Sequence, residues 1–204
     1  MHDGGPPLGN DGTLDLPRLF GRSAPLVLEI GTGMGEGVVA MARADPARDY
    51  LAAEAHVPGV ANLLLLLERQ EVSNVRVAHG DALELLRNRI APGSLDAVHA
   101  FFPDPWPKAR HHKRRLIQPA HVALIRSRLV PGGTLHCATD WEPYAAQMLE
   151  VLTADGELVN PFGGPAPRPP HRPVTRFEQR ARTQGRPVFD IVVHRAALDG
   201  RRPG

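Results

Sequence analysis

Residues 26–35 read LVLEIGTGMG, an apolar run that passes into a turn with glycines at alternate positions. The apolar run predicts a buried strand, and the next segment, near 36–44, has the pattern of a helix. Gly31, Gly33 and Gly35 would therefore lie between a strand and a helix N-terminus. Glycine lets a backbone approach a ligand closely, and a helix N-terminus offers unpaired N–H groups. Such a turn can bind a dinucleotide, a sulfonium cofactor or nothing, so all three interpretations stay open on this motif alone.

Acidic residues near the ends of the first three predicted strands narrow this choice. Glu29 lies in the first strand, Glu54 ends the second about 20 residues later, and Asp81 follows the third. An acid at the position of Glu54 binds ribose hydroxyls in such folds, and Asp81 can accept a hydrogen bond from an adenine amino group. Glu29 can offset a cationic sulfonium or amino group. These carboxylates would repel the negatively charged pyrophosphate of NAD, so the pattern favours S-adenosylmethionine over NAD.

Short β-type runs alternate with helix-length amphipathic runs along most of the chain. This alternation predicts an α/β fold with a parallel sheet covered by helices. The predicted strands lie at 26–31, 50–55, 75–80, 95–102 and 133–140, and the predicted helices at 36–44, 58–70, 81–90, 118–129 and 141–154. After Asp155 a loop rich in Pro and Gly precedes a short helix at 175–183 and a final strand at 188–195. A late antiparallel strand pair that closes the sheet fits this change.

Length and composition limit the class of protein. A chain of 204 residues suits one domain, and residues 1–20 and 197–204 are expected to be loose ends. The single cysteine, Cys137, excludes an internal disulfide and a Cys-based zinc site, and its apolar neighbours predict burial. No apolar run approaches the roughly 20 residues that span a bilayer, and no secretory signal pattern begins the chain. We therefore expect a cytoplasmic protein without a membrane partner.

Residues 101–115 read FFPDPWPKARHHKRR, a turn with three prolines that leads into a basic cluster. The prolines fix φ and restrict Phe102, Asp104 and Trp106, which precede them. Asp104 is the one carboxylate in this stretch, and no further Asp or Glu occurs before Asp140. A rigid acid beside such cations can hold a nucleobase while the cations bind phosphates, although a solvated charge run is the simpler interpretation of the basic part alone.

The chain resembles the bacterial tRNA (guanine-N7-)-methyltransferases over roughly residues 26–195. The resemblance rests on EIGTGMGEG, AAEAHVPGV, FFPDPWPKARHHKRR, LHCATDWEPYAAQML and RPVTRFEQR. It implies a Rossmann-like S-adenosylmethionine methyltransferase fold over one domain, with a mostly parallel seven-stranded sheet, helices on both faces and an antiparallel last strand. The implied reaction transfers a methyl group to N7 of guanosine 46 in the variable loop of tRNA.

The resemblance also implies roles for individual residues. The S-adenosylmethionine pocket would contain Glu29, Gly31, Gly33, Gly35, Glu54, Asp81 and Asp104. The substrate guanosine would contact Lys108, Asp140, Thr175, Arg176, Phe177 and Glu178. The RNA would contact Arg110, His111, His112, Lys113, Arg114 and Arg115.

Asp104 is the expected catalytic residue, as an orienting group. Guanine N7 has an exposed lone pair and no proton, so its attack on a sulfonium methyl needs positioning and no general base. Asp104 can accept hydrogen bonds from guanine N1–H and the 2-amino group, and it favours the positive charge that develops on the ring. Trp106 or Phe102 can stack on the base. Core packing explains Phe102 equally well.

Other interpretations remain open. Asp104-Pro105-Trp106 resembles the turn of adenine-N6 methyltransferases, and a non-catalytic RNA-binding module would also carry the basic cluster. No metal site is expected, because adjacent His111 and His112 point in different directions and cations flank them. Arg168, Arg172 and Arg176 are either a solvated loop or a second RNA-facing edge. Both a monomer and a homodimer are compatible with the sequence.

Overall fold

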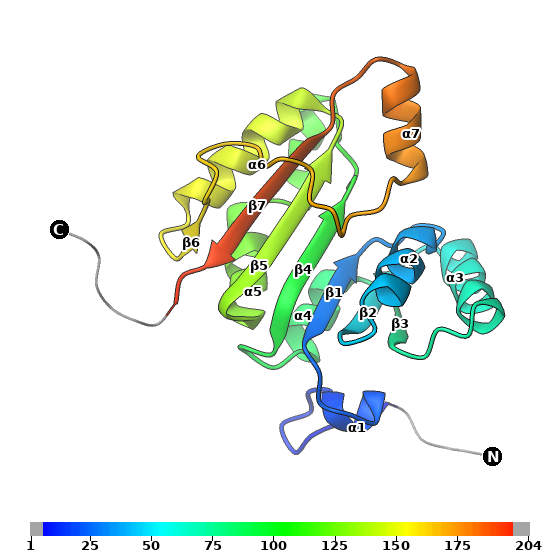
Figure 1. The fold of residues 1–204 in the computed structure, drawn as a ribbon. Helices are drawn as coiled ribbons and strands as arrows, with labels where there is room; N and C mark the ends of the chain where they lie inside the picture. Colours follow the sequence, from blue (N-terminus) through cyan, green and yellow to red (C-terminus); the bar gives the residue numbers. More distant parts are fainter. Residues whose placement is uncertain (1–5, 198–204) are drawn as a thin grey trace.

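A seven-stranded sheet in the order β3-β2-β1-β4-β5-β7-β6 runs through the computed structural model, which describes residues 6–197 (Figure 1). The strands are β1 (Leu26–Ile30), β2 (Asp49–Glu54), β3 (Val75–His79), β4 (Leu95–Phe101), β5 (Leu129–Thr139), β6 (Leu158–Val159) and β7 (Phe189–Arg195). The strands β1 to β5 pair in parallel, whereas β7 is antiparallel to both β5 and β6. The predicted fold class is confirmed.

Helices cover both faces of this sheet (Figure 1). They are α1 (Leu16–Phe20), α2 (Glu36–Ala44), α3 (Val57–Arg69), α4 (Ala82–Asn88), α5 (Pro119–Arg128), α6 (Glu142–Ala154) and α7 (Arg176–Thr183), with a 3₁₀ helix, η1, at Ala109–Arg114. The larger core lies on the face of α4, α5 and α6 and contains Tyr144, Met148 and Cys137, the last of which was predicted to be buried. A smaller core joins the other face to α2 and α3. Coverage of both faces of β1 explains why its sequence, LVLEI, is mostly apolar and every residue in it is buried.

The segment 160–175 crosses the second face of the sheet where no helix covers β5 and β7 (Figure 1). Its anchor is Arg172, which is fully buried. The Arg172 guanidinium binds both carboxylate oxygens of Asp190 in β7, at 2.6 and 2.9 Å, and also pairs with Glu178 of α7. The expectation that Arg172 lies in a solvated or RNA-facing loop is wrong, because these two acids neutralise its charge inside the protein.

The turn after β1 is pressed against α3. Gly35 has φ +87°, and a Cβ built there would lie 2.8 Å from the Leu63 side chain. A Cβ on Gly59 of α3 would lie 2.3 Å from the Gly33 carbonyl oxygen, closer than real atoms approach. Glycines on both sides of this contact therefore determine where the turn lies.

The structure differs from the sequence-based boundaries in two places. β5 begins at Leu129, four residues before the predicted start at Gly133. Residues 130–132 extend the strand, and its register with β4 shifts between Leu95 and Ala97. Near the N-terminus, α1 forms within the segment expected to be loose, and Phe20 packs against the core. The remaining expected loose residues, 1–5 and 198–204, lie outside the described part of the chain.

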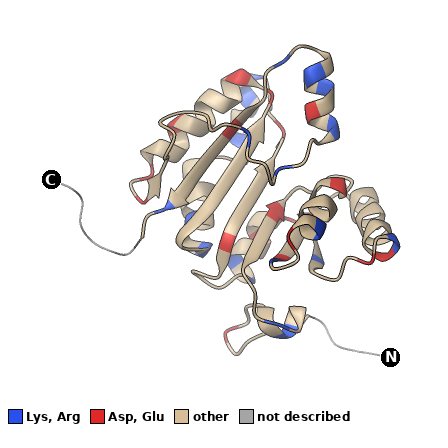
Figure 2. Ribbon diagram, in the orientation of Figure 1, with Lys and Arg blue, Asp and Glu red and all other residues tan. Residues whose placement is uncertain are grey.

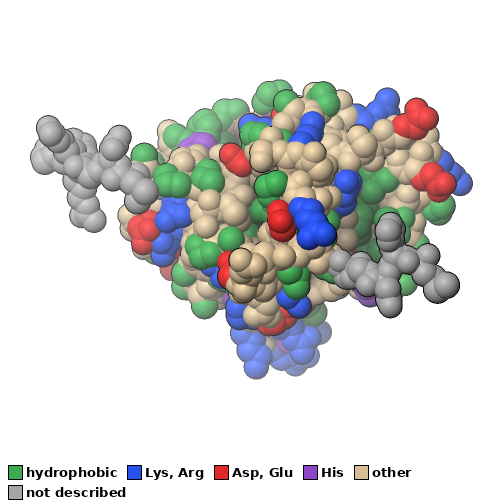
Figure 3. Space-filling model, turned by 90° about the horizontal axis from the view of Figure 1, so that it is seen from below, with side chains coloured by type: hydrophobic (Ala, Val, Ile, Leu, Met, Phe, Trp, Pro, Cys, Tyr) green, Lys and Arg blue, Asp and Glu red, His purple; other side chains and the backbone are tan. Residues whose placement is uncertain are grey.

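Charges are distributed unevenly over the elements. Figure 2 shows Lys and Arg concentrated along α7, which stands beside the carboxyl ends of the strands. Figure 3 shows the opposite end of the molecule, where acidic and basic side chains are interspersed with apolar ones. Within residues 6–197, no helix has the length and apolar character needed to cross a membrane.

We predict that Gly59→Ala destabilises the protein, because the added methyl group must displace the backbone of Gly33. The expected loss in free energy of unfolding is roughly 1–3 kcal/mol, the usual cost of overpacking, measured by urea denaturation. Gly37→Ala is the matched helical control, since its Cβ would meet nothing closer than 3.8 Å. Equal stability of the two variants would show that the close contact does not constrain the turn.

Candidate active site

The carboxyl ends of β1, β2 and β4 open into two adjoining cavities. One, of about 530 Å³, contains Glu54, Asp81 and Asp104 in its wall. The other, of about 410 Å³, contains Glu29 and Thr32. Gly31, Gly33, Phe101, Phe102 and Phe177 line both cavities, so the two form one cleft divided by aromatic side chains. The carboxyl edge of a parallel sheet is where ligands bind in open α/β folds.

Glu29 is a buried acid without a full set of partners. Its side chain points from β1 into the smaller cavity, the residue is 5% exposed, and Oε2 has no hydrogen-bond partner among the described residues. Burial, together with the nearby charge of Glu54, raises the pKa of the Glu29 carboxyl to about 8. Thr32 Oγ1, in the same wall, is also buried and unpartnered within residues 6–197. Unpaired buried polar atoms are costly, so a polar ligand is expected to complete them.

Glu54 both shapes the cleft and lines it. Its Oε2 accepts a hydrogen bond from the Gly33 N–H at 2.7 Å, and its Oε1 accepts one from the His56 N–H at 2.8 Å. These bonds tie the glycine-rich turn to the end of β2. A carboxylate has about four lone-pair sites, so Glu54 retains acceptor capacity toward the cleft.

Asp81 is held in a similar way. It is the N-cap of α4, and its Oδ1 accepts hydrogen bonds from the N–H groups of Leu83 at 2.7 Å and Glu84 at 3.2 Å. These two bonds occupy one of its oxygens, while the residue remains exposed at the cavity wall. The structure therefore places Glu29, Glu54 and Asp81 around one cleft, as predicted from their positions at successive strand ends.

The turn with three prolines forms the far wall of the larger cavity. Asp104 is exposed there, between Phe102 with φ +53° and Trp106 with φ +42°. Left-handed φ is rare for aromatic residues, and residues before proline normally favour extended conformations. The rigidity predicted from the prolines is therefore accompanied by strain, which is typical of functional loops.

Arg115 holds this turn from inside the protein. Its Nε donates to the Pro105 carbonyl at 2.8 Å, its guanidinium lies over the Tyr144 ring at 4.8 Å, and the residue is only 2% exposed. The prediction that Arg115 contacts RNA is therefore wrong, because its charge is committed to the turn and to Gln147.

The other residues of the basic cluster lie closer to solvent. Arg110, Lys113 and Arg114 are exposed, and Arg114 stacks over Trp106 at 5.0 Å. His111 meets the edge of the same ring at 5.7 Å. His112 is half-buried, and its carbonyl accepts a hydrogen bond from Gln118. Three cations of this cluster therefore face outward, whereas the two histidines are half-buried.

The segment 175–178 forms the rim on the side of α7. Thr175 caps this helix by accepting a hydrogen bond from the Glu178 N–H at 3.2 Å. Arg176 is exposed and pairs with Glu36, whereas Phe177 is 57% exposed and stacks on Phe102 at 6.1 Å. Glu178, in contrast, is 1% exposed and bound to Arg172, so the structure does not place its carboxylate toward a substrate.

Two further predicted contact residues differ in their surroundings. Lys108 is exposed at the start of η1. Asp140 follows β5 and pairs with Arg186 at 2.9 Å. Arg186 was not predicted, because it comes 46 positions later in the chain and nothing in the sequence links it to Asp140.

Several solved structures with the same fold are described as methyltransferases. The 16S rRNA methyltransferase KamB superposes with a TM-score of 0.64 at 14% identity, covering 93% of this chain and 95% of that one. The aminoglycoside resistance methyltransferase NpmB1 gives 0.62 at 15% identity with the same coverage. A Streptococcus mutans protein described as "a putative methyltransferase", solved with S-adenosylhomocysteine, gives 0.53 at 11% identity, covering 85% of this chain and 89% of that one. Because the sequence identities are this low, the superpositions show only that the fold is shared.

Sequence relatives are much closer. Residues 23–191 match a family described as "Putative methyltransferase". A tRNA (guanine-N(7)-)-methyltransferase from Streptomyces coelicolor is 58% identical over 184 residues, 89% of this chain and 68% of the relative. One from Nitrosospira multiformis is 55% identical over 179 residues, 88% of this chain and 78% of the relative. The chain therefore belongs to the tRNA (guanine-N(7)-)-methyltransferase family.

Proposed function

We propose that this protein transfers a methyl group from S-adenosylmethionine to N7 of a guanine in tRNA, at guanosine 46 of the variable loop. One observation carries the proposal: a cleft lined by Glu29, Glu54 and Asp81 adjoins a rigid turn that presents Asp104 and Trp106. The family relationship supports the reaction. The cleft offers a site for the cofactor beside a turn that can hold the guanine.

The three strand-end acids fit S-adenosylmethionine. The unpartnered Glu29 Oε2 suits the cationic amino group of the cofactor's amino-acid portion, and Glu54 has acceptor capacity for ribose hydroxyls. Asp81 lies beside them for the adenine amino group. Gly31 and Gly33 keep the turn free of side chains along the same wall, whereas Gly35 lies against Leu63 of α3 and lines neither cavity. When bound, the cofactor supplies a methyl group on a positively charged sulfur, which a neutral nitrogen lone pair can attack.

Asp104 is proposed to orient the guanine. Its carboxylate would accept hydrogen bonds from N1–H and the 2-amino group, and its negative charge would favour the positive charge that develops on the alkylated ring. Phe102, Trp106 and the exposed Phe177 offer flat surfaces for the base. Lys108, Asp140, Thr175 and Arg176 are proposed as further contacts at the rim.

The exposed cations of η1 are proposed to bind the RNA backbone. Arg110, Lys113 and Arg114 face solvent beside the larger cavity, with His111 and His112 behind them. Phosphate contacts of this kind set position and affinity without reading sequence. Because tRNA is the proposed substrate, we place the protein in the cytoplasm, as a monomer or a homodimer.

Two alternatives make different predictions. An adenine-N6 methyltransferase would use the same Asp104-Pro105-Trp106 turn to bind an exocyclic amine. A non-catalytic RNA-binding module would retain tRNA and take up no cofactor. The unpartnered buried acid at Glu29 favours a ligand-binding cleft and thus an enzyme.

The decisive experiment incubates the protein with labelled S-adenosylmethionine and unmodified tRNA transcript, and then identifies the methylated nucleoside. We expect N7-methylguanosine at position 46. Asp104→Ala should lower kcat roughly 10²–10³-fold, the usual cost of removing a charge-stabilising group, with little change in tRNA affinity. Glu68→Ala, which removes an exposed acid on α3, should have wild-type activity. Recovery of N6-methyladenosine, or wild-type turnover by Asp104→Ala, would contradict the proposal.

A second prediction separates two neighbouring cations. Lys113→Ala should weaken tRNA binding and reduce the slope of log K against log salt by about 1, because one phosphate contact is lost. Arg115→Ala should leave that slope unchanged and lower the melting temperature, since Arg115 is buried under the turn. Binding titrations at several salt concentrations and thermal unfolding distinguish the two effects. A change in slope for Arg115→Ala alone would reverse the assignment.

A third prediction concerns the unliganded protein. The pKa of Glu29 is raised from 4.5 to about 8, so the folded chain keeps a proton that the unfolded chain releases. The stabilisation from this group is complete below about pH 4.5 and is lost as the pH rises to about 8. Wild-type protein should therefore lose stability across this range relative to Glu29→Gln, which does not titrate. Urea denaturation at pH 5, 7 and 9 measures the difference, and parallel curves would show that Glu29 ionises normally.

A further inference from the structure

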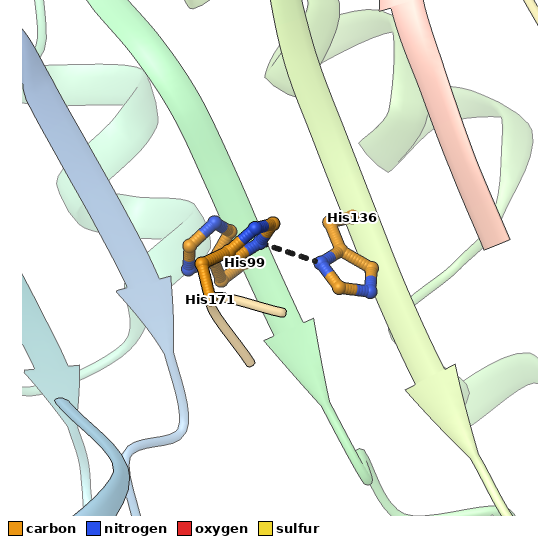
Figure 4. A group of neighbouring side chains, drawn as sticks. All are labelled: His99, His136 and His171. Carbon is orange, nitrogen blue, oxygen red and sulfur yellow. Dashed lines mark hydrogen bonds between the residues drawn. The ribbon is translucent and has the colours of Figure 1, made fainter. Parts of the chain in front are cut away.

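A group of histidines lies under the segment 160–175 and lines neither cavity of the cleft. His99 of β4 and His136 of β5 are direct neighbours in the sheet register, and His171 of the segment lies against them (Figure 4). One ring nitrogen from each histidine lies within 4.8 Å of the other two. These three histidines are far apart in the chain, so no sequence motif predicts that they meet, in contrast to the adjacent His111 and His112.

His136 is oriented by a carboxylate. Its Nε2 lies 2.7 Å from Asp190 Oδ1, and Asp190 is itself fixed by the bidentate contact with Arg172. The ionised carboxylate only accepts hydrogen bonds, so the ring carries its proton on Nε2 and its lone pair on Nδ1. A carboxylate on the outer nitrogen is the usual support of a metal-binding histidine. The free Nδ1 faces His171 Nε2 at 3.3 Å.

His99 supplies a buried nitrogen that lacks a partner. The residue is 5% exposed, and its Nδ1 makes no hydrogen bond within residues 6–197. Its ring is stacked between Phe101, at 4.9 Å, and His171, at 5.5 Å. Leaving such an atom unpaired costs roughly 1–3 kcal/mol, which a bound cation would offset.

We propose that His99, His136 and His171 bind one divalent transition cation of the Zn²⁺ type, and that this cation fixes the segment 160–175 to the sheet. Imidazole ligands suit Zn²⁺, Co²⁺ and Ni²⁺ and do not suit Mg²⁺ or Ca²⁺. The role is structural, because the ligands belong to the sheet and to the segment that leads into α7.

The distances require only small movements of the nitrogens, while the His99 and His171 rings, stacked at an interplanar angle of 17°, must also turn so that their in-plane lone pairs converge. Two nitrogens on a tetrahedral ion are roughly 3.3–3.4 Å apart, since Zn–N bonds are roughly 2.0–2.1 Å, and His136 and His171 already have a separation of 3.3 Å. Three atoms within 4.8 Å of one another have a common point no more than about 2.8 Å from each. Rotation of His99 and His171 by less than about 1 Å at the nitrogen therefore brings all three to bonding distance.

The surrounding charge and access also permit a cation. Arg172, the residue after His171, carries a buried positive charge that Asp190 and Glu178 neutralise. The half-buried Arg48 pairs with Asp45. His171 is exposed, which leaves a path from solvent and room for water as the fourth ligand. Without a cation, His171 simply donates a hydrogen bond to His136, so metal binding and this hydrogen bond are competing states of the same side chains.

Metal binding to the full chain tests the proposal. Tag-free protein is treated with chelator, exchanged into buffer and titrated with Co²⁺, which reports tetrahedral coordination by its visible absorption. We expect one Co²⁺ per chain, displaced by Zn²⁺, and a higher melting temperature with the metal. His171→Gln and His99→Gln should each weaken the affinity at least 10-fold and remove the metal-dependent rise in melting temperature.

His79→Gln is the matched control, because His79 is an exposed histidine outside the cluster and its loss should leave Co²⁺ affinity unchanged. His171 lies on an exposed segment, so its variant tests the proposal even where His99→Gln fails to fold. Wild-type protein without tetrahedral Co²⁺ absorption would overturn the proposal. Wild-type Co²⁺ affinity in His171→Gln would also overturn the proposal, and it would show that His136 and His171 form only a hydrogen-bonded pair.

Discussion

The buried guanidinium of Arg172 connects β7, α7 and the start of the turn with three prolines. It binds Asp190 of β7 and Glu178 of α7, and it lies 5.7 Å from the ring of Phe102, at the start of the turn with three prolines. Removing one partner of such a buried ion pair costs roughly 3–5 kcal/mol. The position of α7, and with it Phe177 over the cleft, therefore depends on this network. Asp190 also orients His136, so the proposed metal cluster depends on the same contact.

The wall of the cleft that contains the glycine-rich turn depends on close packing of that turn against α3. Glycines allow the turn after β1 to touch α3, and the Glu54 carboxylate binds the Gly33 and His56 N–H groups. A ligand in this cleft meets groups that are already fixed, which reduces the ordering cost of binding. The strained φ values of Phe102 and Trp106 fit the same principle on the opposite wall, where Arg115 holds the Pro105 carbonyl.

Much of the fold and of the cofactor side of the cleft could be predicted from the sequence. Apolar runs of strand length alternate with amphipathic runs, and acids at the ends of parallel strands must share one edge of the sheet. This reasoning correctly placed Glu29, Glu54 and Asp81 around one cleft, and their contacts with a cofactor stay a prediction. It failed where burial decides the role of a charge: Arg115, Arg172 and Glu178 look like surface residues in the sequence, yet each is nearly inaccessible.

The failures have a common physical reason. A charged side chain can be buried only with partners, and those partners are distant in the chain, such as Asp190 for Arg172 and the Pro105 carbonyl for Arg115. No local pattern reports such pairs. The histidine cluster was missed for the same reason, although His99 and His136 lie two and three residues before the ends of adjacent parallel strands, which was a usable signal.

A crystal structure with S-adenosylhomocysteine would test most directly whether the strand-end acids form a preformed cofactor pocket. We predict the ligand's amino group beside Glu29, its ribose at Glu54 and its adenine beside Asp81, with the glycine-rich turn and the contacts of Arg172 unchanged. Binding elsewhere, or a rearranged turn after β1 with Glu29 still unpartnered, would contradict this prediction.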